Sequence, residues 1–167
     1  SLRKHFDELC IYLQSLKETY YLIILTEVWI KSGEEDKYQM PGYDMLLQPR
    51  PDGQAGGVCV YIESSLRYSY QLILLPTAEV ISVVVSVLHN NNNLQLTVFG
   101  IYRQCKFTFN QFQSDFENIL RRTSNPTIIT GDMNLCLLKN NNSSKNYLNL
   151  ISAFGFKSLI DIPTRVM

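Results

Sequence analysis

Three short apolar segments of the chain end in polar or titratable side chains. These side chains are Glu27, then Tyr102 with Arg103, and finally Asp132 with Asn134. Rigid strands that present an acid, a phenol and an amide at their ends are a common way to build a site. If the strand ends meet at one edge of the fold, Glu27 and Asp132 could bind a hard divalent cation such as Mg2+, with Mn2+ as a substitute. Asn134 would orient water or a phosphate oxygen, and Tyr102 and Arg103 would stabilise charge on a transferring phosphoryl group.

Each of these residues also has a purely structural interpretation. An acid at the end of a strand, such as Glu27, is more often a solvated turn residue. The Gly-Asp-x-Asn pattern at residues 131–134 often forms an Asx turn. Tyr102 could be a packing residue with a solvated hydroxyl group. The residue pattern alone therefore leaves a metal-assisted phosphoesterase as one hypothesis among several.

The elements that must carry these residues alternate between strands and helices. Apolar residues at helical spacing predict helices over 6–16, 109–120 and 147–154. Apolar, β-branched runs predict strands over 21–26, 58–62, 80–88, 94–102 and 127–130, with a further strand beginning at 159–160. Residues 33–52 are polar and rich in turn signals. Strands joined both by hairpins and by helices predict an α/β sandwich with a mixed sheet.

Composition sets limits on the class of protein. The 167 residues are 46% hydrophobic and 18% charged, which predicts one packed domain over residues 1–167. Fifteen basic and fifteen acidic side chains cancel, which excludes a polybasic binder held by bulk charge. The apolar runs are too short to span a membrane. The four cysteines lie far apart without a Cys-x-x-Cys pair, so we expect reduced thiols and an intracellular setting.

A series of short segments occurs in one order along the chain. The segments are Leu25–Ile30, Pro41–Tyr43, Gly56–Ile62, Ile101–Arg103, Gly131–Asn134 and Pro163–Arg165. The series resembles the endonuclease domain of non-LTR (LINE-type) retrotransposons, which belongs to the endonuclease/exonuclease/phosphatase superfamily with the apurinic endonucleases. The resemblance covers nearly the whole chain. It implies a DNase-like, four-layer α/β sandwich with two mixed β-sheets.

The resemblance also implies roles for individual residues. Glu27 resembles the metal-binding glutamate of a Leu-Thr-Glu-x-Trp stretch, and Tyr102 resembles the active-site tyrosine. Asp132 and Asn134 match Gly-Asp-Phe-Asn with methionine in place of phenylalanine. In the family this aspartate activates or orients the attacking water, and the asparagine contacts the phosphate. The residues expected to contact the DNA backbone are Arg103, Thr164 and Arg165.

The chain departs from the family pattern at both ends. The family's first-strand asparagine and its final Ser-Asp-His have no counterpart between Ser1 and Met167, and neither His5 nor His89 lies at a matching place. We therefore interpret the sequence as a domain that is incomplete at both termini.

The function that the resemblance implies is Mg2+-dependent hydrolysis of DNA phosphodiester bonds, nicking target DNA for retrotransposition beside a reverse transcriptase. The expected partner is DNA, with no membrane and no small-molecule cofactor, and the expected location is the nucleus. Two alternatives stay open. One is a non-catalytic remnant that keeps the fold, and the other is a phosphatase of the same superfamily.

Overall fold

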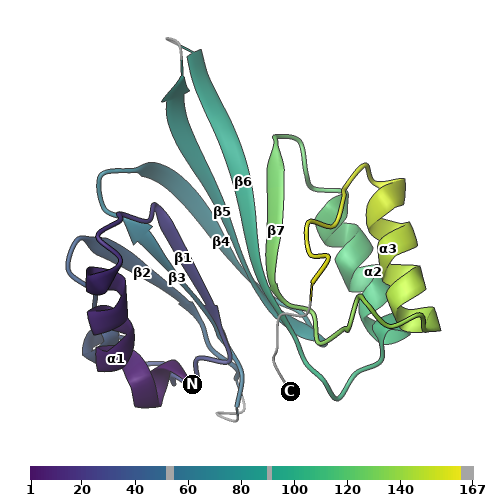
Figure 1. The fold of residues 1–167 in the computed structure, drawn as a ribbon, viewed down its shortest axis with the longest axis horizontal. Coiled ribbons are helices and arrows are strands. Elements are labelled where there is room, and N and C mark those ends of the chain that lie inside the picture. Colours follow the sequence, from purple (N-terminus) through teal and green to yellow (C-terminus); the bar gives the residue numbers. More distant parts are fainter. Residues whose placement is uncertain (52–54, 90–91, 163–167) are drawn as a thin grey trace.

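A computed structural model of the chain describes residues 1–51, 55–89 and 92–162. Its helices are α1 (Leu2–Ser15), α2 (Phe109–Leu120) and α3 (Asn142–Ala153), with a short 3-10 helix η1 (Glu35–Tyr38). Its strands are β1 (Leu22–Thr26), β2 (Tyr43–Gln48), β3 (Val58–Glu63), β4 (Arg67–Leu74), β5 (Ala78–His89), β6 (Asn92–Arg103) and β7 (Thr127–Asp132). Figure 1 shows two sheets packed face to face between these helices.

The two sheets differ in strand direction. One has three strands in the order β1-β3-β2, and both of its pairings are antiparallel. The other has the order β4-β5-β6-β7, and its β6–β7 pairing is parallel while the other two are antiparallel. The expectation of a mixed sheet is thus confirmed for the four-stranded sheet, whereas the three-stranded one is antiparallel. Parallel neighbours need a crossover connection, and α2 supplies one between β6 and β7.

Four layers stack in the order α1, three-stranded sheet, four-stranded sheet, and α2 with α3, as expected from the sequence (Figure 1). Strand β3 shows how the sequence produces this stacking. Cys59 and Tyr61 pack in the core beneath α1. Val58, Val60 and Ile62 pack between the two sheets. Because successive side chains of a strand point to opposite faces, an all-apolar strand such as β3 must be covered on both sides.

An aromatic cluster fixes α2 and α3 on the outer face of the four-stranded sheet. Phe112 and Phe116 lie one turn apart on α2, and Phe116 stacks on Tyr147 of α3 with ring centroids 5.6 Å apart. Thr108 and Gln111 form a reciprocal capping box at the start of α2. The apolar face of α2 packs on the sheet and its first backbone N–H groups are capped, which together explain why the crossover is helical.

None of the helices in the described ranges has the length and hydropathy that a bilayer crossing requires.

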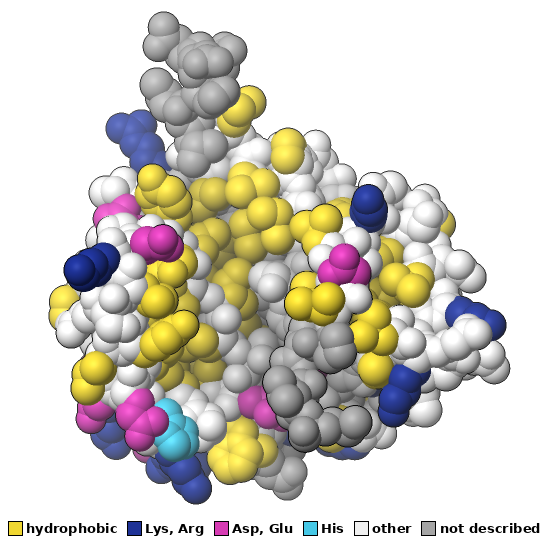
Figure 2. Space-filling view, viewed as in Figure 1, with side chains coloured by type: hydrophobic (Ala, Val, Ile, Leu, Met, Phe, Trp, Pro, Cys, Tyr) yellow, Lys and Arg dark blue, Asp and Glu magenta, His cyan; other side chains and the backbone are white. Residues whose placement is uncertain are grey.

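The facing edges of the two sheets are partly open. Strand β1 lies against β6 and β7 of the other sheet, and every residue of β1 is only half-buried. Ile128 on β7 is 50% exposed. Figure 2, in the orientation of Figure 1, shows hydrophobic side chains gathered across the middle of this face. Part of the core between the sheets is therefore accessible to solvent on this side.

Three local features differ from the sequence-based expectation. Residues 33–52 contain β2, which forms because β3 offers it a paired edge. Strand β4 was not expected, since most of its side chains are exposed and its apolar pattern is weak. Residues 159–160 form no strand and both are exposed. Apolar runs indicated the edge strands β1 and β7 but not the edge strands β2 and β4.

Candidate active site

Glu27 and Tyr102 meet across the gap between the two sheets. The Tyr102 hydroxyl donates a hydrogen bond to Glu27 Oε1 over 2.6 Å, although the two residues are 75 positions apart in the chain. Tyr102 is 3% exposed. Burial, with the hydrogen bond to Glu27 and the charge of its carboxylate, raises the pKa of Tyr102 well above the usual range of a phenol. At neutral pH Tyr102 is therefore a fixed hydrogen-bond donor.

A strained turn directs Glu27 toward the second sheet. Glu27 has φ of +54° and Trp29 has φ of +61°, a backbone conformation that residues other than glycine rarely adopt. Val28 between them is fully buried. The backbone N–H of Trp29 donates to the carbonyl of Gly56 over 3.0 Å. The packing of Val28 and this hydrogen bond stabilise the strained backbone. Strained backbone conformations are frequent at functional sites.

Asp132 and Asn134 join the pair through the parallel β6–β7 ladder. Asp132 is the register partner of Tyr102. The backbone N–H of Asn134 donates to Asp132 Oδ1 over 2.7 Å, so the Asx-turn interpretation is confirmed. Asn134 Nδ2 donates to the carbonyl of Arg103 over 2.6 Å, and Asn134 has φ of +50°. The turn thus holds Asp132, whose backbone pairs with Tyr102, and ties the Asn134 side chain to the residue that follows Tyr102.

Arg103 holds the loop that follows β7. It is 4% exposed, and burial lowers the pKa of its guanidinium group. Nε donates to the carbonyl of Met133 over 2.5 Å, one terminal nitrogen donates to Asn134 over 3.0 Å, and the other donates to Phe107. Three backbone carbonyls therefore surround the group that was expected to contact substrate. Direct substrate contact by Arg103 stays a prediction, while its anchoring of the Asn134 loop is a property of the structure.

Sequence reasoning missed a buried ion pair behind Tyr102. Glu79 is the cross-strand partner of Tyr102 and is fully buried. Its Oε1 lies 3.2 Å from Arg50 Nε and accepts from Gln104 Nε2 over 2.6 Å. The Arg50 guanidinium carbon lies 5.7 Å from the centre of the Tyr102 ring. The available signal was an acidic residue at an inward position of an apolar strand, because such a charge needs a partner.

The structure does not test two of the predicted site residues, and it bears on one of the two histidines to which no role was assigned. Thr164 and Arg165 lie outside the described residues. His5 is exposed and lies 2.7 Å from Glu8, so it belongs to the surface of α1. The side chain of His89 is also outside the described part of the chain.

The carboxylates of Glu27 and Asp132 suit a partly hydrated metal site better than a site ligated by protein groups alone. Within residues 1–51, 55–89 and 92–162, no group of three or more His, Cys, Asp or Glu side chains could hold a metal ion. Mg2+ is usually bound through one or two carboxylates, with water and substrate phosphate completing its shell. Glu27 contacts the Tyr102 hydroxyl and Asp132 is the backbone neighbour of Tyr102, which suits a partly hydrated ion. A fully protein-ligated cage does not fit these residues.

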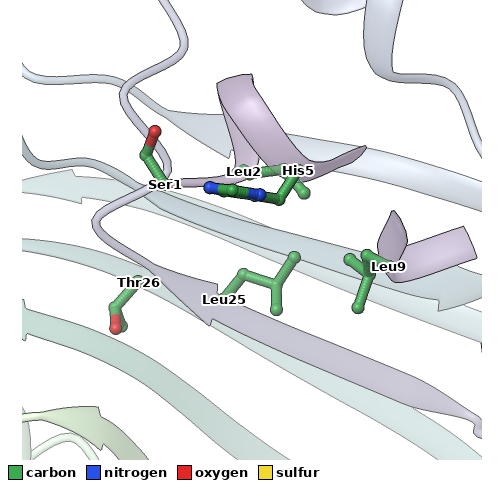
Figure 3. A pocket seen from close by; sticks show the side chains of 6 residues that line it. All are labelled: Ser1, Leu2, His5, Leu9, Leu25 and Thr26. Carbon is green, nitrogen blue, oxygen red and sulfur yellow. The ribbon is translucent and has the colours of Figure 1, made fainter. Parts of the chain in front are cut away.

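A hollow of about 260 Å3 lies between α1 and the end of β1. Figure 3 shows its side chains, with Leu25 and Thr26 on the strand and Leu2, His5 and Leu9 on the helix. No carboxylate is among its described lining residues. The hollow therefore borders the candidate site without containing its chemical groups.

The model of the Endonuclease/Exonuclease/phosphatase family matches residues 2–149, which is most of the chain. None of the curated proteins matches the chain.

Solved structures share the fold at low sequence identity. The catalytic domain of human Nocturnin with bound sulfate is 14% identical, with a TM-score of 0.57, over 90% of this chain and 63% of that one. D. rerio TDP2 complexed with a single-strand DNA product is 15% identical, with a TM-score of 0.56, over 92% and 58%. A mannosyl-6-phosphatase of Bacteroides thetaiotaomicron is 12% identical, with a TM-score of 0.54, over 89% and 62%. This chain thus spans less than two thirds of their length, and the likeness shows the fold alone.

Proposed function

The chain belongs to the endonuclease/exonuclease/phosphatase family, and on that premise we propose that it hydrolyses DNA phosphodiester bonds with the help of Mg2+. The observation that carries the proposal is the 2.6 Å hydrogen bond from Tyr102 to Glu27 beside the Asp132–Asn134 turn. An acid, a phenol, a second acid and an amide come from three strand ends of two sheets. Groups of these types at one place suit the transfer of a phosphoryl group to water.

Each side chain has a role that follows from its surroundings. Glu27 would hold Mg2+, which when bound supplies positive charge next to the phosphate. Tyr102 stays protonated at neutral pH, and its one hydroxyl proton, which Glu27 accepts in this structure, would turn to an oxygen that gains negative charge once Glu27 holds the cation. Asp132, held by the N–H of Asn134, would orient the attacking water. Asn134, fixed by its bond to the Arg103 carbonyl, would contact the phosphate.

The choice of DNA over a small phosphate ester rests on the sequence. Thr26-Glu27-x-Trp29 and Tyr102-Arg103 are the segments that resemble the retrotransposon endonucleases. Hydrolysis of DNA phosphodiester bonds by this chain would serve to nick target DNA in the nucleus. The neutral charge of the chain implies that binding uses a few local contacts.

The test is relaxation of supercoiled plasmid by the chain with Mg2+. We expect nicking that Glu27→Gln reduces about a hundredfold, because the variant loses the charge that would hold the cation. Glu8→Gln, which changes an exposed carboxylate on α1, is the matched control and should nick at the parent rate.

Two results would contradict the proposal. One is a folded chain that leaves plasmid intact while it releases phosphate from a sugar phosphate, which favours the phosphatase alternative. The other is equal nicking by the parent chain and Glu27→Gln, which assigns the activity to another site or to a contaminant.

A further inference from the structure

A second hollow, of about 430 Å3, opens on the other side of Tyr102. Among the described residues that line it, Arg50, Gln104 and Lys106 supply polar groups, and Pro51 with Leu74–Pro76 supplies an apolar wall. None of these lining residues is acidic. The hollow thus combines an apolar surface with cations and an amide, which is the combination that a nucleotide needs.

The hollow is connected to the candidate active site through Arg50 and Gln104. The Arg50 guanidinium carbon lies 5.7 Å from the centre of the Tyr102 ring, whose hydroxyl contacts Glu27. Gln104 follows Tyr102 by two positions and contacts the same buried carboxylate as Arg50, that of Glu79. A strand of nucleic acid with its phosphate at Tyr102 would therefore reach the hollow with a neighbouring nucleotide.

The two cations of the hollow, Arg50 and Lys106, differ in burial and pairing. Arg50 is paired with the fully buried Glu79, so it offers hydrogen-bond donors with little net charge. Lys106 is exposed and lies 5.2 Å from the centre of the Phe107 ring. It forms no salt bridge with the described carboxylates. Lys106 is therefore the cation available to a phosphate group.

Two buried polar atoms of the lining residues have no hydrogen-bond partner in the part of the chain that the structure describes. One terminal nitrogen of Arg50 and Oε1 of Gln104 are buried without a hydrogen bond among the described residues. Buried polar atoms are nearly always satisfied, so this pair calls for an explanation. Both atoms have almost no accessible surface, so a base would reach them only if the Arg50 or Gln104 side chain turned outward.

The apolar wall is accessible from solvent. Leu74 at the end of β4 is 49% exposed and stands beside Leu75 and Pro76. A flat base face can pack on such a wall, because burial of apolar surface is favourable and non-directional.

We propose that this hollow is a subsite for the nucleotide next to the cleaved phosphodiester bond. The base packs on the Leu74–Pro76 wall, and the phosphate on its far side binds Lys106. The inference rests on the proposed function, since it takes the substrate to be a polynucleotide.

The test is binding of the 5′-phosphorylated dinucleotide pdTpdT, which carries two phosphates, to the 15N-labelled chain, followed by NMR without divalent metal so that no hydrolysis occurs. We expect shifts of the Leu75, Gln104 and Lys106 amides. Lys106→Ala should weaken binding about fivefold and lower the salt dependence by about 0.7 in log–log slope, because one phosphate contact is lost. Leu74→Ala should weaken binding about threefold through lost apolar contact.

Matched controls separate the hollow from general surface effects. Lys145→Ala removes an exposed lysine of α3. Leu138→Ala removes a leucine that is 50% exposed, close to the exposure of Leu74. Both should bind the dinucleotide as the parent chain does, and inorganic phosphate should shift the Lys106 amide alone.

Failure of the subsite and failure of the proposed function give different results. If the chain nicks plasmid, Glu27→Gln does not, and pdTpdT leaves residues 74–76 and 104–106 unshifted, the subsite is wrong while the function stands. If pdTpdT shifts these residues but plasmid stays intact, nucleotide binding holds and hydrolysis of DNA is wrong. Equal affinity of Lys106→Ala, Leu74→Ala and the parent chain also overturns the subsite.

Discussion

Replacing Glu79 by glutamine removes the only charge that the described structure places against the buried guanidinium group of Arg50. The Arg50 side chain is 11% exposed and that of Glu79 is fully buried, so water screens their 3.2 Å contact weakly. Breaking a buried pair from one side costs about 3–5 kcal/mol. We take about 3 kcal/mol, because the amide that replaces the carboxylate can still accept from Gln104 and a little water reaches Arg50.

Urea unfolding measures this loss. With a denaturant slope of about 2 kcal/mol per M, Glu79→Gln should lower the unfolding midpoint by about 1.5 M. Adding Arg50→Met to Glu79→Gln should recover at least half of the loss, since the uncompensated charge is then gone. Glu8→Gln, in an exposed pair with His5, should leave the midpoint unchanged. A shift below about 0.3 M for Glu79→Gln, or strictly additive effects in the double variant, would refute the reasoning.

Three further predictions concern alkaline pH, thiol reactivity and the backbone before Asp132. The pKa of Tyr102 is raised above its unfolded value of 10.0, so its stabilisation is complete below that pH and is lost as pH rises further. Tyr102→Phe should therefore lose less stability than the parent chain above about pH 10 in urea unfolding. Burial raises the pKa of the Cys59 thiol to about 12, so a thiol reagent should modify exposed Cys105 in the native chain and Cys59 only after unfolding. Gly131→Ala should cost more than about 4 kcal/mol, because its φ is +130° and a Cβ would lie 2.0 Å from the Ile101 carbonyl oxygen. Gly155→Ala, with φ of +78° and open space around it, should cost about 1 kcal/mol.

Different outcomes would contradict each of the three. Identical pH profiles for the parent chain and Tyr102→Phe would show that the phenol titrates normally. Modification of Cys59 at the rate of Cys105 would mean that β3 is accessible in the native chain. Equal stabilities for Gly131→Ala and Gly155→Ala would remove the steric reason for glycine before Asp132.

Local sequence predicted the elements that are buried on both sides or strongly amphipathic. Residues 58–62 are continuously apolar, and they form β3 at the centre of the three-stranded sheet. The phenylalanine spacing of 109–116 predicted α2. Edge strands β2 and β4 were missed, because pairing with a neighbour defines them more than their own side chains do.

Some features of the candidate site could likewise be predicted from the sequence and others could not. The strand ends that carry Glu27, Tyr102 and Asp132 could be predicted, because apolar runs stop there. The Arg50–Glu79 pair could not, since its members are 29 residues apart and only the packed sheets bring them together. The anchoring of Arg103 by three backbone carbonyls could not be predicted either, because every residue type carries a backbone carbonyl.

The most direct test of the site is Mn2+ titration of the 15N-labelled chain, because Mn2+ takes the oxygen ligands that suit Mg2+ and broadens nearby NMR signals. The site proposed here predicts that the amides of Glu27, Tyr102, Asp132 and Asn134 broaden together at the lowest Mn2+ concentration. Glu27→Gln should raise the concentration needed for all of them. Broadening that begins instead around the surface carboxylate of Asp44, or that is unchanged in Glu27→Gln, would contradict the central claim that these strand ends form one metal-binding site.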